Sequence, residues 1–243
     1  MSGLHAGLTV GLPFCGRPTS PWWAVCMATM DWPMGIDVSY QIVQNHEVGA
    51  AREIIADEAI KNNAKYLWFI DDDTAPPRHA AKKLIAELQK DEDLAVIGGI
   101  YCSKSETPEP IVQKRLRDGC FWNWEVGEVF ECEGLATGCM MIRVEVLKKL
   151  PKPWFRTIDT LDTQNGTGQK ATDDLFFCCR LKEFGFRIKA HGGVLPFHWD
   201  VTNNRSYGVP LGHTGRPITR VLGISEAMTG CTVLDEQKEV VGA

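Results

Sequence analysis

The sequence predicts an α/β fold with a largely parallel central sheet, because buried strands and amphipathic helices alternate through roughly its first hundred residues. The segments Leu8–Phe14, Tyr66–Ile70 and 94–100 are short apolar runs, typical of strands that are buried on both faces. Residues 78–90 carry apolar side chains at helical spacing between the last two strands. Such sheets bind ligands beyond the carboxyl ends of their strands, so we expect function there.

The other elements of this first half follow from shorter patterns. Residues 21–30 are expected to form a short helix whose large apolar side chains lie in the core. Residues 38–43 alternate between apolar and polar types, which predicts a second strand. Residues 49–62 carry an apolar stripe that fits a helix packed on a sheet.

The second half of the sequence predicts fewer regular elements. Residues 103–133 are expected to form loops and a hairpin, and the polar, glycine-rich residues 159–171 a mobile loop. A helix is predicted at 172–184, where Thr172 can cap the start and Gly185 can end it. We also expect a buried strand at 134–143, a short helix at 144–150, a short strand at 187–190 and a tail without periodicity beyond Asp200.

The composition is that of an ordinary globular protein, with 243 residues, 44% hydrophobic and 23% charged. A formal net charge of −5 argues against bulk nucleic-acid binding. The nine cysteines lack the paired spacing of a zinc site, so most are expected to be reduced core residues. Neither a signal peptide nor an apolar run of the roughly 18 residues that a membrane span needs is visible, and we expect a cytoplasmic protein.

Three consecutive carboxylates, Asp71, Asp72 and Asp73, follow the buried strand Tyr66–Ile70. Their mutual repulsion costs free energy unless a cation or hydrogen-bond donors offset it. One reading is a surface or helix-capping role. A second is the aspartate nucleophile of a haloacid-dehalogenase-like phosphotransferase, although Ala75 stands where that motif has Thr or Val. A third is the DxD motif of a nucleotide-sugar transferase, since hard divalent cations prefer carboxylate oxygens.

The downstream sequence ATDDLFFCCRLKEFGFRIKAHGGVLPFHW favours the third reading. It resembles the C-terminal signature of GT-A-fold glycosyltransferases of the family-2-like group, with Asp173 where that group usually has Glu. Ala51-Arg52 is similar to the group's donor-site helix, with Glu53 where Asn is common, and GLATGCMMIR resembles its acceptor-side strand. The matching positions in the C-terminal signature are Asp173, Asp174, Arg180, Gly185 and His198, and the resemblance extends over roughly residues 8–200.

The resemblance implies a GT-A fold, which is a Rossmann-like α/β/α sandwich with a mixed, mostly parallel central sheet. Residues 1–243 would form a single domain. Within it, about 1–100 would bind the nucleotide sugar, about 101–200 would hold the acceptor and catalytic groups, and 201–243 would be a C-terminal tail. The implied activity is metal-dependent transfer of a sugar, with inversion, from a nucleotide-diphosphate sugar (UDP-sugar foremost) to an acceptor hydroxyl.

The resemblance also implies roles for individual residues. Mn²⁺ or Mg²⁺ would be held by Asp71, Asp73 and His198, and an imidazole ligand favours manganese. Asp174 would be the catalytic base, and Asp173 would orient the acceptor or a loop. The donor-binding residues would be Pro13, Arg52, Asp71 and Asp72.

Two other classes of protein remain open. A nucleotidyltransferase shares the α/β core and acidic metal site, although GLPFCGRP is a poor match to the glycine-rich, basic phosphate loop of that class. A catalytically silent sugar-binding module is disfavoured by the intact acidic residues. The acceptor is left open among a glycan, a protein, a small molecule and a hydroxylated DNA base.

Overall fold

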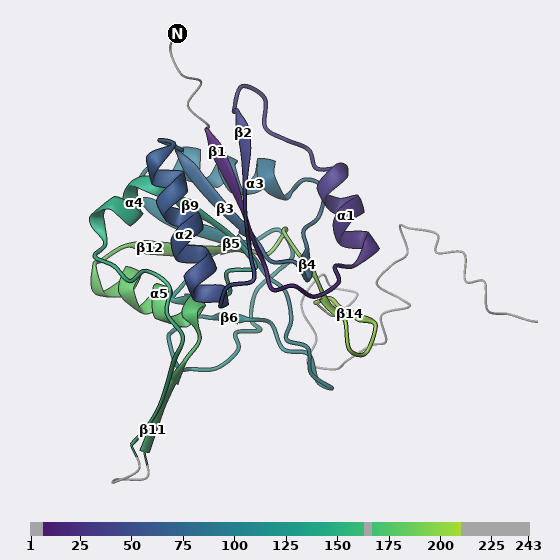
Figure 1. Cartoon of the computed structure of the whole chain (residues 1–243), viewed down its shortest axis with the longest axis vertical. Coiled ribbons are helices and arrows are strands. Elements are labelled where there is room, and N and C mark those ends of the chain that lie inside the picture. Colours follow the sequence, from purple (N-terminus) through teal and green to yellow (C-terminus); the bar gives the residue numbers. More distant parts are fainter. Residues whose placement is uncertain (1–6, 163–166, 210–243) are drawn as a thin grey trace, which may run out of the picture.

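The computed structural model describes residues 7–162 and 167–209, which fold around a seven-stranded sheet (Figure 1). The strand order is β2-β1-β3-β9-β5-β12-β7. Their bounds are β1 Leu8–Phe14, β2 Val38–Gln44, β3 Tyr66–Ile70, β5 Leu94–Gly99, β7 Val129–Cys132, β9 Cys139–Arg143 and β12 Arg187–His191. The strands β2, β1, β3, β5 and β12 run in one direction, while β9 and β7 run against their neighbours. The expected mixed, mostly parallel sheet is therefore confirmed.

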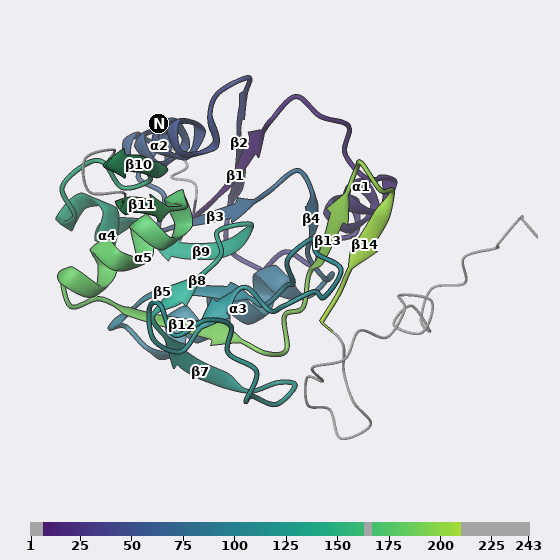
Figure 2. The ribbon, with the colours of Figure 1, turned by 90° about the horizontal axis from the view of Figure 1, so that it is seen from below.

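Helices cover both faces of this sheet, because successive side chains of a strand point to opposite faces (Figure 2). Leu67 and Phe69 of β3 pack in one core with α2 (Val48–Lys61), α4 (Val144–Lys149) and α5 (Asp173–Glu183). The alternate residues of β3, Tyr66, Trp68 and Ile70, pack in a second core with α3 (Ala80–Lys90). The result is the α/β/α sandwich that the sequence predicts.

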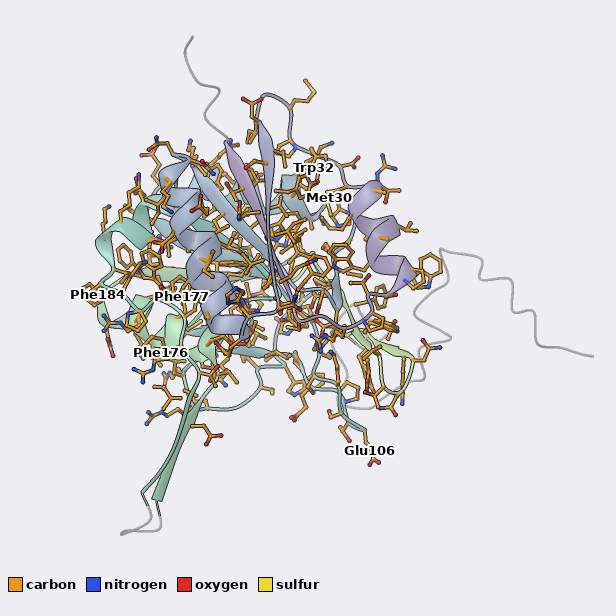
Figure 3. All side chains as sticks on the ribbon, in the orientation of Figure 1. Met30, Trp32, Glu106, Phe176, Phe177 and Phe184 are labelled. Carbon is orange, nitrogen blue, oxygen red and sulfur yellow. The ribbon has the colours of Figure 1, made fainter. Side chains whose placement is uncertain are left out.

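The helix α5 shows how this packing places a functional segment. Phe177 is fully buried on the inner side of α5 and its ring lies 4.5 Å from that of Phe155, whereas Phe184 lies at the surface beyond the end of the helix (Figure 3). Gly185 has a φ of +73°, which glycine adopts freely and which ends the helix as expected. The buried face of α5 is thereby held against the core.

Smaller sheets complete the fold. The strands β4 (Thr74–Ala75), β13 (Phe197–Asp200) and β14 (Arg205–Tyr207) form an antiparallel sheet next to α1 (Figure 2), so the tail expected beyond Asp200 begins with a strand. The two-residue strands β6 (Val112–Gln113) and β8 (Gly134–Leu135) pair with each other. Within the described ranges, no helix has the length and apolar character needed to cross a membrane.

Three expectations about local structure are wrong. The helix α1 (Pro21–Ala28) buries none of its residues, and Trp22 and Val25 are 41% and 48% exposed, because α1 lies at the rim of the sandwich with only one side against the core. The expected loop at 159–171 contains the paired strands β10 (Ile158–Asp162) and β11 (Thr167–Ala171), which lead away from the sheet in Figure 1. The expected hairpin within 103–133 is absent, because β7 joins the edge of the main sheet instead.

The cysteines divide evenly by burial. Cys102, Cys132, Cys139 and Cys178 are buried, and burial raises the pKa of each thiol. The other described cysteines, Cys15, Cys26, Cys120 and Cys179, are exposed or partly buried. Cys15, Cys102, Cys120, Cys132, Cys139, Cys178 and Cys179 are free thiols, and only half of the eight described cysteines belong to the core.

Candidate active site

Segments distant in the sequence meet at the carboxyl ends of the parallel strands. The aspartates 71–73 follow β3, the loop with Cys15 and Arg17 follows β1, and Tyr101 and Cys102 follow β5. Asp71 donates its backbone N–H to the carbonyl of Gly138, just before β9, at 3.2 Å, and the Gly138 N–H donates to the Tyr101 hydroxyl at 3.0 Å. Ligands of open α/β sheets bind at this edge.

Asp72 holds the loop after β1. Its carboxylate is only 1% exposed, and it accepts hydrogen bonds from the Cys15 backbone N–H at 3.0 Å and from the Arg17 guanidinium at 3.0 and 3.2 Å. A buried carboxylate with these partners is committed to the protein itself. Asp72 therefore anchors Arg17, and its contact with the donor stays a prediction.

Asp73 is a buried carboxylate surrounded by cationic groups. One of its oxygens, Oδ2, lies 2.6 Å from an Arg17 nitrogen and also accepts a hydrogen bond from the Lys104 ammonium. Burial alone would raise the pKa of Asp73, but hydrogen bonds and charges from His198 and Lys104 outweigh it and hold that pKa well below the ordinary value of 3.8. Asp73 is thus a permanent anion at neutral pH.

The other oxygen of Asp73 faces His198. The distance from Asp73 Oδ1 to His198 Nε2 is 3.6 Å, and the opposite ring nitrogen, Nδ1, lies 2.8 Å from the Cys102 carbonyl oxygen. A carbonyl only accepts, so Nδ1 carries the ring proton and the Nε2 of a neutral ring presents a lone pair to Asp73. Two acceptors that face each other need a proton or a cation between them.

Arg52 joins the strand end to the amino end of α5. Its guanidinium is 3% exposed, donates to Asp71 at 2.6 Å and donates to Asp173 through its other terminal nitrogen. Burial raises the pKa values of Asp71 and Asp173 above 3.8, and Arg52 opposes this shift without cancelling it. The two terminal nitrogens of Arg52 contact carboxylates and position these two groups, and the expected role of Arg52 at the donor stays a prediction.

Asp174 lies beside Asp173 in the first turn of α5, where a negative charge is favoured by the helix dipole. Its Oδ1 accepts the Leu175 backbone N–H at 2.7 Å and the Thr172 hydroxyl. Thr172 is the N-cap residue by position, but its hydroxyl bonds Asp174 and makes no capping bond to the helix. Unlike Asp173, Asp174 is only partly buried, so its carboxylate is accessible from solvent.

The structure brings together most, but not all, of the expected site residues. Asp73 and His198 face each other, while Asp71 turns to Arg52. No group of three carboxylate, imidazole or thiol side chains converges for a metal ion within 7–162 and 167–209. Pro13 is buried within β1 and pairs in register with Val43, so its role at the donor stays a prediction.

Sequence reasoning missed the two cations that hold Asp73. Arg17 and Lys104 are 56 and 31 positions away from Asp73 in the chain and belong to irregular loops, where no periodic pattern identifies a partner. The available signal was the charge balance itself: three adjacent carboxylates after a buried strand require compensation. Arg180, by contrast, pairs with Glu183 at 2.7 Å on the surface of α5 and lies outside the site.

Comparisons with known proteins identify the activity class and the fold. Residues 40–150 match the family described as Glycosyl transferase family 2, a range that contains Arg52, the three aspartates and Lys104. The crystal structure of A197 from STIV is similar, with a TM-score of 0.58 and 19% identity over 86% of this chain and 97% of that chain. No curated protein sequence matches the chain.

A second similar structure is that of GalNAc-T7 with UDP, GalNAc and Mn²⁺. Its TM-score is 0.52 at 11% identity, over 79% of this chain and 43% of that chain. Because the sequence identities are below 25%, these two structures show that the fold is similar and nothing more. The match over residues 40–150, together with the shared fold, supports a GT-A-fold glycosyltransferase that resembles the family-2 group.

Proposed function

We propose that the chain transfers a sugar from a UDP-sugar to an acceptor hydroxyl, with inversion at the anomeric carbon and with a divalent metal at Asp73 and His198. The observation that carries the proposal is the 3.6 Å approach of Asp73 Oδ1 and His198 Nε2, a carboxylate oxygen and a ring nitrogen that face each other with either a proton on Nε2 or a metal ion between them. The residues proposed to bind the donor, to hold the metal and to act as the base then lie at the same edge of the sheet.

The residues present fit such a metal ion. Asp73 stays ionised, and the bond from His198 Nδ1–H to the Cys102 carbonyl fixes the tautomer that leaves Nε2 free for a metal, as second-shell partners of metal-bound histidines do. A mixed oxygen and nitrogen ligand pair suits Mn²⁺ better than Mg²⁺. A metal bound there neutralises charge on the departing nucleotide diphosphate.

The protein's own groups would do the rest of the chemistry. Asp174 is the more accessible carboxylate of the acidic pair and would take the proton from the acceptor hydroxyl as that oxygen attacks the anomeric carbon. Asp173, held by Arg52, would keep the amino end of α5 in place beside the donor site. Because Arg52 also holds Asp71, donor and acceptor sides are linked through one buried guanidinium.

The choice of a UDP-sugar as the donor is supported by the proposed metal site and by one similar structure. GalNAc-T7, whose fold is similar, was crystallised with UDP and Mn²⁺. We extend this to a UDP-sugar donor here, with the acceptor left open among a glycan, a protein, a small molecule and a hydroxylated DNA base. A single domain over residues 1–243 and a cytoplasmic location belong to the same proposal, and the free, buried thiols of Cys102, Cys132, Cys139 and Cys178 support the location.

The test is a donor screen. The full chain is incubated with UDP-, GDP- and CMP-sugars, with Mn²⁺ or with EDTA, and release of the nucleotide is measured with water as the surrogate acceptor. The proposal predicts release from a UDP-sugar that needs Mn²⁺ and is lost in Asp73→Asn. Equal release in EDTA would contradict the metal, and release of pyrophosphate from a nucleoside triphosphate would point to a nucleotidyltransferase instead.

A further inference from the structure

Two loops each contribute a cationic side chain that contacts the same oxygen of Asp73. Arg17, in the loop after β1, lies 2.6 Å from Asp73 Oδ2, and Lys104, in the loop after β5, donates to the same atom. The other oxygen faces His198. Asp73 therefore has one side available to a metal and one side occupied by the chain's own cations.

These cations are partly accessible, in contrast to Arg52. The side chains of Arg17 and Lys104 are 39% and 21% exposed, whereas that of Arg52 is 3% exposed. Arg17 is also anchored from behind, because Nε and Nη2 both donate to the buried Asp72. The site thus has a solvent-accessible guanidinium and a solvent-accessible ammonium beside Asp73, and the guanidinium of Arg17 is held in place by Asp72.

Their position has a consequence for metal binding. A divalent cation bound to Asp73 and His198 lies next to two positive charges on the same carboxylate, and like charges at such distances repel. A nucleotide diphosphate brings negative charge to the same place. Phosphate oxygens are strong acceptors for guanidinium and ammonium groups, and arginine binds them in a bidentate manner.

We propose that Arg17 and Lys104 are ligands of the donor diphosphate, which hold Asp73 while the donor site is empty and turn to the phosphate oxygens when nucleotide and metal bind. This inference rests on the proposed function and adds two residues to it. Metal and nucleotide then bind cooperatively: each cation opposes the metal alone and favours the metal together with the diphosphate.

Calorimetry on the full chain tests this with two titrations, Mn²⁺ alone and UDP in the presence of saturating Mn²⁺. In Lys104→Met and Arg17→Met, loss of a repelling charge should tighten Mn²⁺ binding several-fold. The same variants should bind UDP about 10- to 100-fold more weakly, the range for a lost hydrogen bond to a charged group. The opposite signs of the two effects distinguish phosphate binding from general damage to the site.

The controls use matched changes of charge. Arg187→Met and Lys182→Met remove cations near the start of β12, the amino end of a strand parallel to β5, and therefore at the opposite edge of the sheet from Asp73. Both should leave the two affinities unchanged. Arg17→Lys keeps a positive charge and should recover part of the UDP affinity, and melting temperatures verify that every variant is folded. Uridine, which lacks phosphates, should bind wild type and Lys104→Met equally.

The outcomes separate the two proposals. If the wild type binds UDP with Mn²⁺ and folded Arg17→Met and Lys104→Met bind it equally well, the phosphate role is wrong while the proposed function stands. Equal losses for UDP and uridine would likewise overturn a diphosphate contact. If the wild type binds no nucleotide diphosphate with Mn²⁺, the proposed function fails and this inference fails with it.

Discussion

Asp73 and Asp173 are carboxylates of nearly equal burial, 6% and 5% exposed, whose pKa values are shifted in opposite directions. Asp73 has Arg17, Lys104 and His198 around it, and these partners outweigh the cost of burial. Asp173 shares the single cation Arg52 with Asp71 and lies beside Asp174, so burial prevails. The charged and hydrogen-bonding partners of each carboxylate, not its depth of burial, decide the direction of its pKa shift.

This difference assigns separate tasks to the two acidic clusters. Under the proposed function, Asp73 at the strand end supplies the charge that binds a metal and a diphosphate, while the start of α5 holds the base Asp174 and the positioning residue Asp173. This contrast between Asp73 and Asp173 can be tested by substituting the residues of each cluster.

The largest expected effect is on catalysis at Asp174. Asp174→Asn removes the base but keeps the shape and a hydrogen-bonding side chain, so the rate of donor turnover should fall by about 10²–10⁴-fold with UDP affinity unchanged. Stability should change by only about 0.3–1 kcal/mol, the value of a charge at a helix start. The measurement is single-turnover release of UDP, with Glu183→Gln at the far end of α5 as the matched control. A near wild-type rate would remove Asp174 from the base role.

The next effect is on stability at Arg52. Arg52→Met leaves Asp71 and Asp173 buried without their cation, which should cost about 3–5 kcal/mol of unfolding free energy at pH 7. The loss should shrink as the pH falls, because a carboxylate with a raised pKa becomes neutral first. Urea unfolding at pH 7 and pH 5 measures both.

Arg78→Met is the control for this variant, since Arg78 forms an ion pair with Asp31 at the surface, 2.9 Å apart and 69% exposed on the arginine side. Its expected cost is about 0–1 kcal/mol. Equal losses for Arg52→Met and Arg78→Met would mean that the buried bridge contributes no more than a surface pair.

A smaller effect is expected at Asp73, with the opposite dependence on pH. A carboxylate whose pKa is lowered in the folded state contributes stability above its unfolded pKa and loses it as the pH falls. The wild type should exceed Asp73→Asn by about 1.5–3 kcal/mol at pH 7, the range for hydrogen bonds to a charged group, and this gap should narrow below the ordinary pKa of 3.8. Thermal unfolding between pH 3 and pH 7 follows the gap, and a gap that widened in acid would reverse the assigned shift.

The smallest effect is expected at Thr172. Thr172→Val removes the hydroxyl that bonds the partly buried Asp174, and the net loss should be about 0.5–1.5 kcal/mol. Thermal unfolding beside Arg52→Met places the two losses on one scale. A loss at Thr172 as large as that at Arg52 would show that the start of α5 is held by its exposed side and not by the buried bridge.

The parts of the fold that the sequence predicts correctly are those with a local signal. The apolar runs of β1, β3 and β5 and the apolar stripe of α3 each identify their own element, and the Asp-Asp pair at the start of α5 is typical of a helix start. Elements without such a signal were missed. The edge strand β7 has only four residues, and the paired strands β10 and β11 are mostly polar in sequence.

The presence or absence of a local sequence signal also explains which residues of the site could be predicted. Asp73, Asp174 and His198 occupy positions of a known motif, so the resemblance identifies them. The contacts of Asp73 with Arg17 and Lys104, and the bridge of Arg52 to Asp173, join loops and helices that only the folded chain brings together. Their formation depends on where β1, β3 and β5 end relative to one another, which no local pattern specifies.

The central claim, that the strand end at Asp73 is the metal and donor site, is tested most directly by X-ray diffraction from crystals soaked with Mn²⁺ and UDP, recorded where manganese scatters anomalously. The account predicts one strong anomalous peak bonded to Asp73 and His198, with the UDP diphosphate beside it. A manganese peak at other residues, or UDP bound away from Asp73, would contradict it.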